Sequence, residues 1–400
     1  MSRAYFIHVG SLVLTKAADG LIDPKLVLAW LLNAIGAPGY IIGILVPVRE
    51  SGSLLPQLFL ARQIEAQSQR KSFWIAGSAV QGIAAIGIAA AAVLLSGATV
   101  GWIVLACLAV LAVARAACSA SYKDILARTV KKGQRGKVSG TASTIAAVIV
   151  FAFAILLSFG IWPRTPLAVS LAVCIAGGLW VLAAVLFSRL DEPEADTDND
   201  DGRPLSDLVK PLWDDSEFQV YLATRALLIS TALAPPFLVM LGNLGEGGPG
   251  NLGVLLIASS LAAILSSYFW GALSDRSSRQ TLMIAAAAAC ATFLIAAAVG
   301  FIGLGELKAV AIPALIFAAQ IAYNGARAGR KTHLTDMDAG GRTAVYTALS
   351  NTLIGVMLLA GGLLGFVADA FGPAVVLAIL GAFSGFAVLT AWQLSEVQAD

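Results

Sequence analysis

Charged residues are scarce in this chain. Asp, Glu, Lys and Arg together make up 12% of its 400 residues, about half of their usual share in soluble domains. Between Phe73 and Ala114, 42 consecutive residues include none of these four types and no histidine. A mean hydropathy of +0.84 agrees with this pattern. Because roughly 20 apolar residues let a helix cross a bilayer, the sequence excludes an ordinary water-facing surface and predicts an all-α polytopic membrane protein.

Cysteine and histidine are also rare. The four cysteines lie inside apolar blocks without a CxxC spacing, so we expect small core residues. Two histidines, His8 and His333, are too few for a histidine-based metal site. The chain has no nucleotide-phosphate loop and shows no catalytic constellation around either histidine. We therefore expect no metal, no cofactor, no nucleic acid partner and no enzyme activity.

The apolar blocks predict about twelve membrane helices. The long block from Phe73 divides into two at Ser96-Gly97, and most of the others are one crossing long. The predicted helices cover residues 4–33, 37–63, 73–96, 99–122, 137–160, 164–188, 217–241, 250–274, 281–303, 308–330, 341–367 and 373–396.

One long hydrophilic stretch, residues 189–217, separates the first six predicted helices from the last six. It is rich in Asp and Glu and is interrupted by Pro193, Pro204 and Pro211. Acidic, proline-broken sequence of this kind favours a solvated linker over a folded domain. The predicted organisation is therefore a six-helix bundle at 1–188, an acidic linker at 189–217 and a second six-helix bundle at 218–400.

Basic residues are distributed unevenly between the two predicted sides of the membrane. If the N-terminus is cytoplasmic, that side holds nineteen of them, Arg327 and Arg330 included, and the other side holds only Arg164 and Lys308. The positive-inside rule then places both termini and the acidic linker in the cytoplasm. We expect a monomer in a bacterial inner membrane, with the lipid bilayer as its surroundings.

A sequence motif stands at the turn after the eighth predicted helix. Residues 271–280 read Gly-Ala-Leu-Ser-Asp-Arg-Ser-Ser-Arg-Gln, which resembles the G-x-L-x-D-R-x-x-R signature of the major facilitator superfamily. The equivalent turn of the first half, residues 61–71, keeps a carboxylate and one arginine but has lost the glycines. The resemblance implies two six-helix bundles and a latch, in which a carboxylate pairs with arginines and a helix N-terminus. The latch residues would be Glu65, Arg70, Gly271, Asp275, Arg276 and Arg279, and the alternative is a simple basic turn.

Other matches to this superfamily are partial. Residues 111–115, ending at Arg115, resemble its motif in the fourth helix, although Cys118-Ser119 replaces the usual Gln-Gly. The fifth helix lacks the Gly-Pro pair that marks many drug:proton antiporters, which weakens the case for a drug exporter. Residues 361–365 with Asp369 and Gly372 are similar to the family's eleventh helix ending. These motifs indicate a superfamily and no particular substrate.

Several charged residues fall inside the predicted helices, where they are costly and usually mark substrate or ion paths. They are Lys16, Asp19, Asp23 and Lys25 in the first helix, Arg49 and Glu50 in the second, Arg115 in the fourth and Arg225 in the seventh. Gly20 and Pro24 predict a break in the first helix, and Pro47 and Pro56 permit bends in the second.

Two interpretations of these charges stay open. In one they form a neutralised ion-pair network that holds the bundles together. In the other, which we favour, a carboxylate titrates while an uncommitted arginine binds an anionic group. Glu50 is the first candidate for the titrating group, because low dielectric favours the protonated carboxyl, and Asp19 is the second.

Uncharged polar residues extend this candidate site. Gln320, Tyr323 and Asn324 share one face of the tenth helix by their spacing, and Asn351 is expected to join them. Gln57 of the second helix completes the set, and each residue has the alternative role of an interhelical hydrogen bond in packing.

The leading functional hypothesis is a secondary active transporter that exposes a midplane site to each side in turn. Its solute would be a small organic molecule, with the arginines favouring an anion, and we expect coupling to protons. A drug or metabolite efflux antiporter is one alternative. A membrane-embedded enzyme, a channel and a non-transporting receptor are alternatives from other classes.

Overall fold

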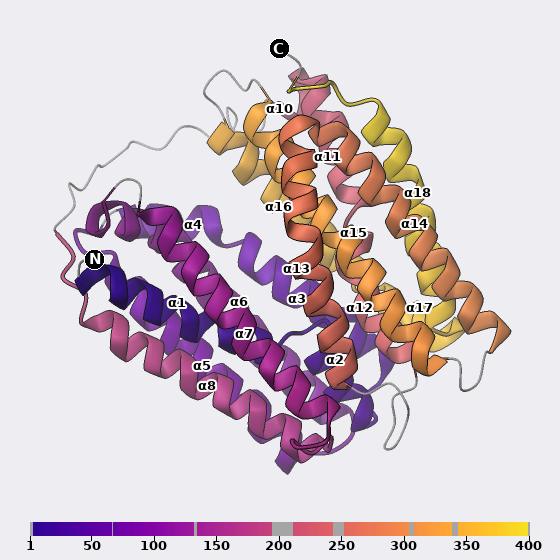
Figure 1. Ribbon diagram of the computed structural model, residues 1–400, viewed down its shortest axis with the longest axis horizontal. Helices are drawn as coiled ribbons and strands as arrows, with labels where there is room; N and C mark the ends of the chain where they lie inside the picture. The colour runs from indigo at the N-terminus through magenta and orange to yellow at the C-terminus, as the bar shows by residue number, and fades with distance from the viewer. Residues whose placement is uncertain are drawn as a thin grey trace.

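The structure is a computed structural model, and its described part covers residues 3–65, 67–131, 134–193, 211–242, 252–303, 308–337 and 343–398. Throughout these ranges the regular secondary structure is helical, without a strand. Figure 1 shows two helical bundles, one built from the first half of the chain and one from the second. The predicted all-α fold with two bundles is thus confirmed. Most of the predicted acidic linker, residues 194–210, lies outside the described residues.

The first bundle contains the helices up to Ser188. In chain order they are α1 (Arg3–Leu21), α2 (Val27–Ala34), α3 (Gly39–Leu54), α4 (Gln57–Glu65), α5 (Lys71–Leu94), α6 (Ala98–Thr129), α7 (Arg135–Ser158) and α8 (Pro166–Ser188). Helix α5 packs between α6 and α8, while α1 packs on α7 and α8. The break at Ser96-Gly97 is as predicted, and Gly97 makes this turn with a positive φ of 68°.

The second bundle begins after the short helix α10 (Pro211–Asp214). Its helices are α11 (Ser216–Leu227), α12 (Ser230–Leu241), α13 (Leu252–Arg276), α14 (Ser278–Ile302), α15 (Lys308–Asp336), α16 (Thr343–Gly361), α17 (Leu364–Phe371) and α18 (Pro373–Trp392). Helix α14 packs on α15 and α18, and α13 packs on α15. Capping side chains mark several helix starts, such as Asp215 before α11 and Ser277 before α14.

Four of the twelve predicted crossings are divided into two helices each. The first is α1 with α2, the second α3 with α4, the seventh α11 with α12, and the eleventh α16 with α17. The break next to Pro24 was predicted, since proline cannot donate a backbone hydrogen bond. The division next to Pro56 falls where a bend was predicted, whereas Pro47 lies inside α3. Ten helical segments in the described ranges are long and apolar enough to cross a membrane. The divided, charge-bearing first and second crossings are not among those ten.

The bundles meet on the side of the molecule opposite to the two chain ends. There the Asp369 carboxylate at the end of α17 accepts hydrogen bonds from the backbone nitrogens of Gly39 and Tyr40, at 2.8 and 3.0 Å. This carboxylate caps the first turn of α3 across the bundle interface, where a helix N-terminus favours a negative charge. Nearby, a Cβ at Gly43 would lie 2.7 Å from the Cα of Gly365, so both positions require glycine for this approach.

Two further contacts close the same side. The Ser51 hydroxyl of α3 donates to the backbone oxygen of Gly355 in α16 at 2.7 Å. The end of α7 meets the start of α13, where a Cβ at Gly253 would lie 2.4 Å from the backbone nitrogen of Ser158. Toward the end of the molecule that carries the termini, the two bundles diverge (Figure 1). The fold is therefore closed on one side and open on the other.

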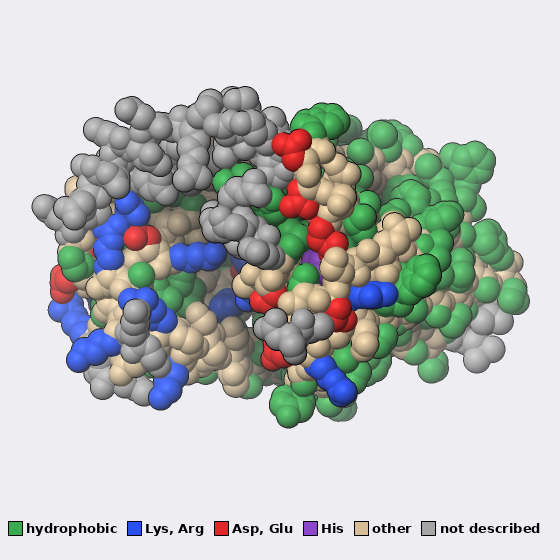
Figure 2. All heavy atoms as spheres, turned by 90° about the horizontal axis from the view of Figure 1, so that it is seen from above, with side chains coloured by type: hydrophobic (Ala, Val, Ile, Leu, Met, Phe, Trp, Pro, Cys, Tyr) green, Lys and Arg blue, Asp and Glu red, His purple; other side chains and the backbone are tan. Residues whose placement is uncertain are grey.

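Large hydrophobic side chains cover the outer helices. Ile295 of α14 is 56% exposed, and Phe386 and Leu389 of α18 are 59% and 57% exposed. In Figure 2 hydrophobic side chains cover the right-hand part of the face, and charged side chains gather at its left and centre. So much exposed apolar area is not compatible with water, and it indicates that these helices face lipid.

Candidate functional site

The structure divides the predicted midplane charges into two groups. The first lies inside the first bundle, around Asp19 of α1. Arg49 of α3 donates from Nη2 to one carboxylate oxygen of Asp19 at 3.0 Å, and Arg115 of α6 forms an ion pair with the other oxygen. The Asp19 carboxylate is thus shared by two guanidinium groups. Lys16, one turn earlier on α1, makes no ion pair within 4.0 Å with any described carboxylate and lines a separate cavity with Asp19 and Arg115.

Asp23 stabilises the break between α1 and α2. Its carboxylate accepts hydrogen bonds from the backbone nitrogens of Lys25 and Leu26, at 2.7 and 3.1 Å. The Lys25 ammonium lies 3.6 Å from the centre of the Tyr323 ring, which belongs to α15 of the other bundle. The broken backbone therefore directs a cation across the bundle interface, where it makes a cation–π contact.

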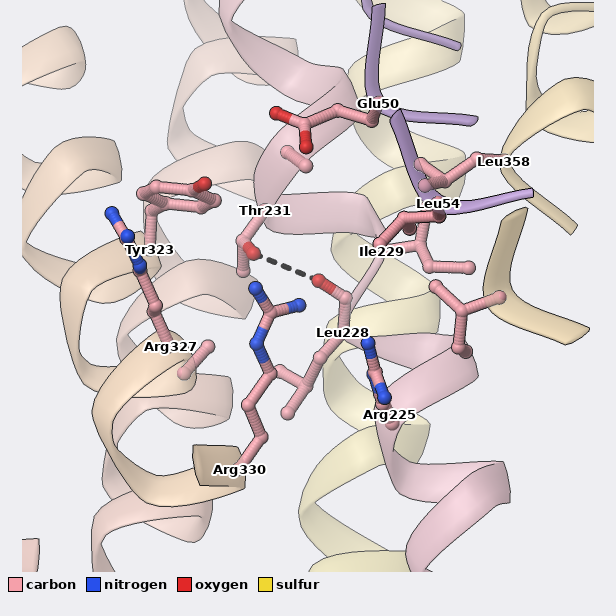
Figure 3. A pocket seen from close by; sticks show the side chains of 13 residues that line it. Glu50, Leu54, Arg225, Leu228, Ile229, Thr231, Tyr323, Arg327, Arg330 and Leu358 are labelled. Atoms are coloured by element: carbon pink, nitrogen blue, oxygen red, sulfur yellow. Dashed lines mark hydrogen bonds between the residues drawn. The ribbon is translucent and has the colours of Figure 1, made fainter. Parts of the chain in front are cut away.

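The second group of charges lines a pocket between the bundles. Glu50 of α3 forms one wall, and Arg225 of α11 with Arg327 and Arg330 of α15 form the other, beside Tyr323. Figure 3 shows Glu50 on the side of the pocket opposite to Arg225 and Arg330. The pocket has a volume of about 60 Å³, which is room for roughly four water molecules.

No charge in this pocket is neutralised by a close partner. Within the described ranges, neither Glu50 nor any of the three arginines forms an ion pair within 4.0 Å. Three guanidinium groups face one carboxylate, so the pocket carries an excess of positive charge. Chemically it can hold a small anion through bidentate hydrogen bonds.

Arg225 is oriented by neutral side chains of α16. Its Nη1 donates to the Ser350 hydroxyl at 2.6 Å, and its Nη2 donates to the Asn351 amide oxygen at 2.7 Å. Its Nε is buried and has no hydrogen-bond partner. Asn351 also donates weakly to Gln57 of α4 at 3.4 Å, which connects the two bundles. Arg225 is therefore held in place while its positive charge stays uncompensated.

The predicted polar face on α15 is present, but its partners differ from those expected. Gln320 donates to Asn324 at 3.1 Å, and Asn324 donates to Ser266 of α13 at 3.0 Å. This chain of hydrogen bonds lies within the second bundle. Asn351 does not join it, because Asn351 contacts Arg225 instead. Tyr323 turns toward the first bundle and Lys25.

Sequence reasoning missed two arginines of this pocket. Arg327 and Arg330 both lie within the predicted tenth helix, residues 308–330, where they were counted only as basic residues of its cytoplasmic end. The structure continues α15 to Asp336, so both residues lie well inside the helix, and they line the pocket. The sequence spacing could have identified them. Arg327 follows Tyr323 by four residues and Arg330 follows Arg327 by three, so the three side chains share one helix face.

The candidate latch of the second half is not engaged in this conformation. Asp275 and Arg276 are exposed in the last turn of α13, and Arg279 is half-buried in the first turn of α14. None of the three forms an ion pair with a described partner. A Cβ at Gly271 would meet nothing within 4 Å, so packing here does not require that glycine.

The equivalent turn of the first half is tied to its own bundle. Arg70 pairs with Asp124 of α6 at 3.1 Å. The Glu192 carboxylate, just after α8, accepts hydrogen bonds from the backbone nitrogens of Arg70 and Lys71 at the start of α5. The predicted latch carboxylate Glu65 has a side chain that lies outside the described residues.

Comparison with solved structures places the fold. The chain is similar to the nucleoside transporter NupG with a TM-score of 0.74 at 12% identity, covering 98% of this chain and 100% of that one. It is also similar to a POT family transporter solved with a thioalcohol-conjugated peptide, with a TM-score of 0.71 at 10% identity. That match covers 96% of this chain and 94% of the other. The xylose transporter XylE from E. coli, in an inward open conformation, gives a TM-score of 0.68 at 9% identity. That match covers 98% of this chain and 95% of the other.

Sequence comparison gives the family. No curated protein matches the chain. The sequence pattern of the Major Facilitator Superfamily matches residues 11–302, which is well over half of the chain. The pattern spans most of the first bundle and the second bundle as far as the end of α14, and it includes the motif at residues 271–280. The chain therefore belongs to the major facilitator superfamily and is a membrane transporter rather than an enzyme, as its sequence predicts.

Proposed function

We propose that this protein is a proton-coupled secondary transporter of a small organic anion, which binds between the two bundles. The observation that carries the proposal is the pocket of Glu50, Arg225, Arg327 and Arg330, where a positive excess has no close partner. Guanidinium groups suit carboxylates and phosphates and keep their charge at any physiological pH. An anion that enters the pocket supplies the missing negative charge.

Glu50 links the anion to protons. As a carboxylate, Glu50 competes with the solute for the same arginines, which it faces across the pocket (Figure 3). Once protonated, it no longer attracts them, and the arginines are free to bind the solute. Proton and anion therefore bind together, which is the behaviour of a symporter. Asp19 is less suited to this role, because two arginines hold its charge inside one bundle.

The bundles expose the pocket to each side in turn. In the present conformation α3 is closed against α16 and α17, and the side with the termini is open. We assign this open side to the cytoplasm on the asymmetry of basic residues. A cysteine at position 198, in the acidic linker, should then react with an impermeant reagent only in permeabilised cells. Labelling in intact cells would reverse the orientation.

Transport in proteoliposomes tests the function. With an imposed inward proton gradient, we expect accumulation of one or more small carboxylates or phosphate esters, and counterflow of the same solute without a gradient. Arg225→Gln should weaken solute binding by about tenfold or more, because it removes a charge-assisted contact. Arg189→Gln, an exposed arginine next to α8, is the matched control. Transport of only neutral or cationic solutes, unaffected by Arg225→Gln, would contradict the proposal.

A further inference from the structure

A second cavity lies inside the first bundle, apart from the pocket between the bundles. Its volume is about 290 Å³, and it shares no lining residue with that pocket. The floor comes from α5 and α8, where Trp74, Gln81 and Trp180 are 3%, 2% and 0% exposed. Lys16 of α1 and Arg115 of α6 are only partly buried and mark the mouth. The cavity has room for a small organic molecule.

Two buried polar atoms in the floor have no hydrogen-bond partner. They are the amide oxygen Oε1 of Gln81 and the indole nitrogen Nε1 of Trp180. The Gln81 amide nitrogen is already used, since it donates to the Gly77 backbone oxygen at 3.1 Å and to Cys118 Sγ at 3.3 Å. Burying such groups without partners is unfavourable. The floor therefore offers one acceptor and one donor to a molecule in the cavity.

The cavity carries an excess of positive charge, which favours the binding of an anion. Both oxygens of Asp19 already pair with Arg49 and Arg115, so its single negative charge is shared among these arginines and Lys16. Lys16, Arg115 and Lys123 line the cavity with one carboxylate, Asp19, so the lining carries two more positive charges than negative ones. An ammonium group in a partly enclosed cavity is stabilised by a negative partner.

We propose that this cavity is a second binding site, which takes a small hydroxycarboxylate. The carboxylate of the ligand pairs with Lys16, and a ligand oxygen accepts the indole N–H of Trp180. The ligand hydroxyl donates to the amide oxygen of Gln81. The site is independent of Arg225 and Glu50, so it does not depend on the function proposed for the pocket between the bundles.

Calorimetric titration of the purified full-length protein tests this site. The probes are glycolate, L-lactate, L-malate and citrate, each against its counterpart without the hydroxyl, namely acetate, propionate, succinate and tricarballylate. We expect at least one hydroxycarboxylate to bind about tenfold more tightly than its counterpart. Gln81→Met should abolish this preference, and Lys16→Gln should weaken both members of the pair about tenfold. Lys16→Arg should retain binding.

Further variants separate this site from the pocket between the bundles. Trp180→Phe keeps an aromatic ring but removes the indole N–H together with the pyrrole part of the indole, so it should weaken hydroxycarboxylate binding several-fold. The unfolding temperature of this variant is measured beside its binding, because Trp180 is fully buried. Arg225→Gln should leave this binding unchanged. Binding that is lost in Arg225→Gln but unaffected by Lys16→Gln and Gln81→Met would overturn the second site and leave the proposed function standing. Absence of binding by all four hydroxycarboxylates would also overturn it.

Discussion

The two groups of charges at the centre of this transporter use the same residue types in opposite ways. Asp19 is shared by Arg49 and Arg115 within one bundle, whereas Glu50 faces Arg225 and Arg330 across the interface between bundles without a close ion pair. Partners within one bundle move together when the bundles rock, so their ion pairs persist. Partners across the interface separate and meet again. We therefore propose that the first group supports stability and that the second acts in the transport cycle.

Asp19→Asn should have the largest effect on stability. It leaves two arginines without their shared counter-charge, and breaking a partly buried network of this kind costs roughly 2 kcal/mol. We expect a clearly lower unfolding temperature in detergent and a low yield of folded protein. The control is Glu50→Gln, which breaks no ion pair within 4.0 Å among the described residues. A stable Asp19→Asn variant that has lost only proton coupling would reverse the comparison.

Glu50→Gln should act on transport and leave the fold intact. The glutamine mimics a permanently protonated carboxyl, so solute accumulation driven by a proton gradient should fail while solute exchange persists. The unfolding free energy should change by less than about 1 kcal/mol. The measurement is uptake and exchange in proteoliposomes at several pH values. If the variant still accumulates solute with an unchanged pH dependence, Glu50 belongs to a structural network and Asp19 is the next residue to test.

Much of the fold could be predicted from the sequence, because apolar length and helix breakers act locally. Gly20 and Pro24 predicted the break in the first crossing, and Gly97 predicted the turn after α5, whereas at Pro56 only a bend was predicted. The division of the seventh crossing at residues 228–229 was not predicted. Two consecutive prolines, Pro235 and Pro236, lie inside α12 instead of ending it, so tertiary packing overrides the local preference there.

The partners of the site residues could not be predicted in the same way. The sequence placed Asp19, Arg49 and Glu50 in one set. Arg49 and Glu50 are adjacent on a helix, however, so their side chains point in different directions. Arg49 turns toward Asp19, and Glu50 turns to the pocket between the bundles. Pairing is a property of helix packing across distant segments, which no local spacing encodes. Arg330 was missed for a different reason, since it stood at the predicted end of its helix and was counted only toward the charge of the cytoplasmic side, whereas α15 continues to Asp336.

The closed side of the interface can be weakened at Asp369. Asp369→Asn keeps one acceptor oxygen but loses the negative charge that caps α3 across the interface. A contact of this type contributes roughly 1–2 kcal/mol, so the closed state of this side should be disfavoured by about tenfold. A cysteine at Tyr40, which is half-buried and stacks on Phe366 across this interface, should then react faster with a reagent added from that side. An unchanged labelling rate relative to the same cysteine with Asp369 intact would contradict the role of this cap.

The open side offers the last and smallest test, at Asp275. This residue is exposed and has no described ion-pair partner while the side with the termini is open. If the family latch forms only when this side closes, Asp275→Asn disfavours the closed state by about 1 kcal/mol, the value of an exposed charge pair. Exchange should then slow roughly fivefold, with solute affinity within a few-fold of the native protein. Asp214→Asn, an exposed carboxylate on the same side, should change neither quantity. Abolished solute binding in a folded Asp275→Asn protein would place Asp275 in the binding site and remove the latch role.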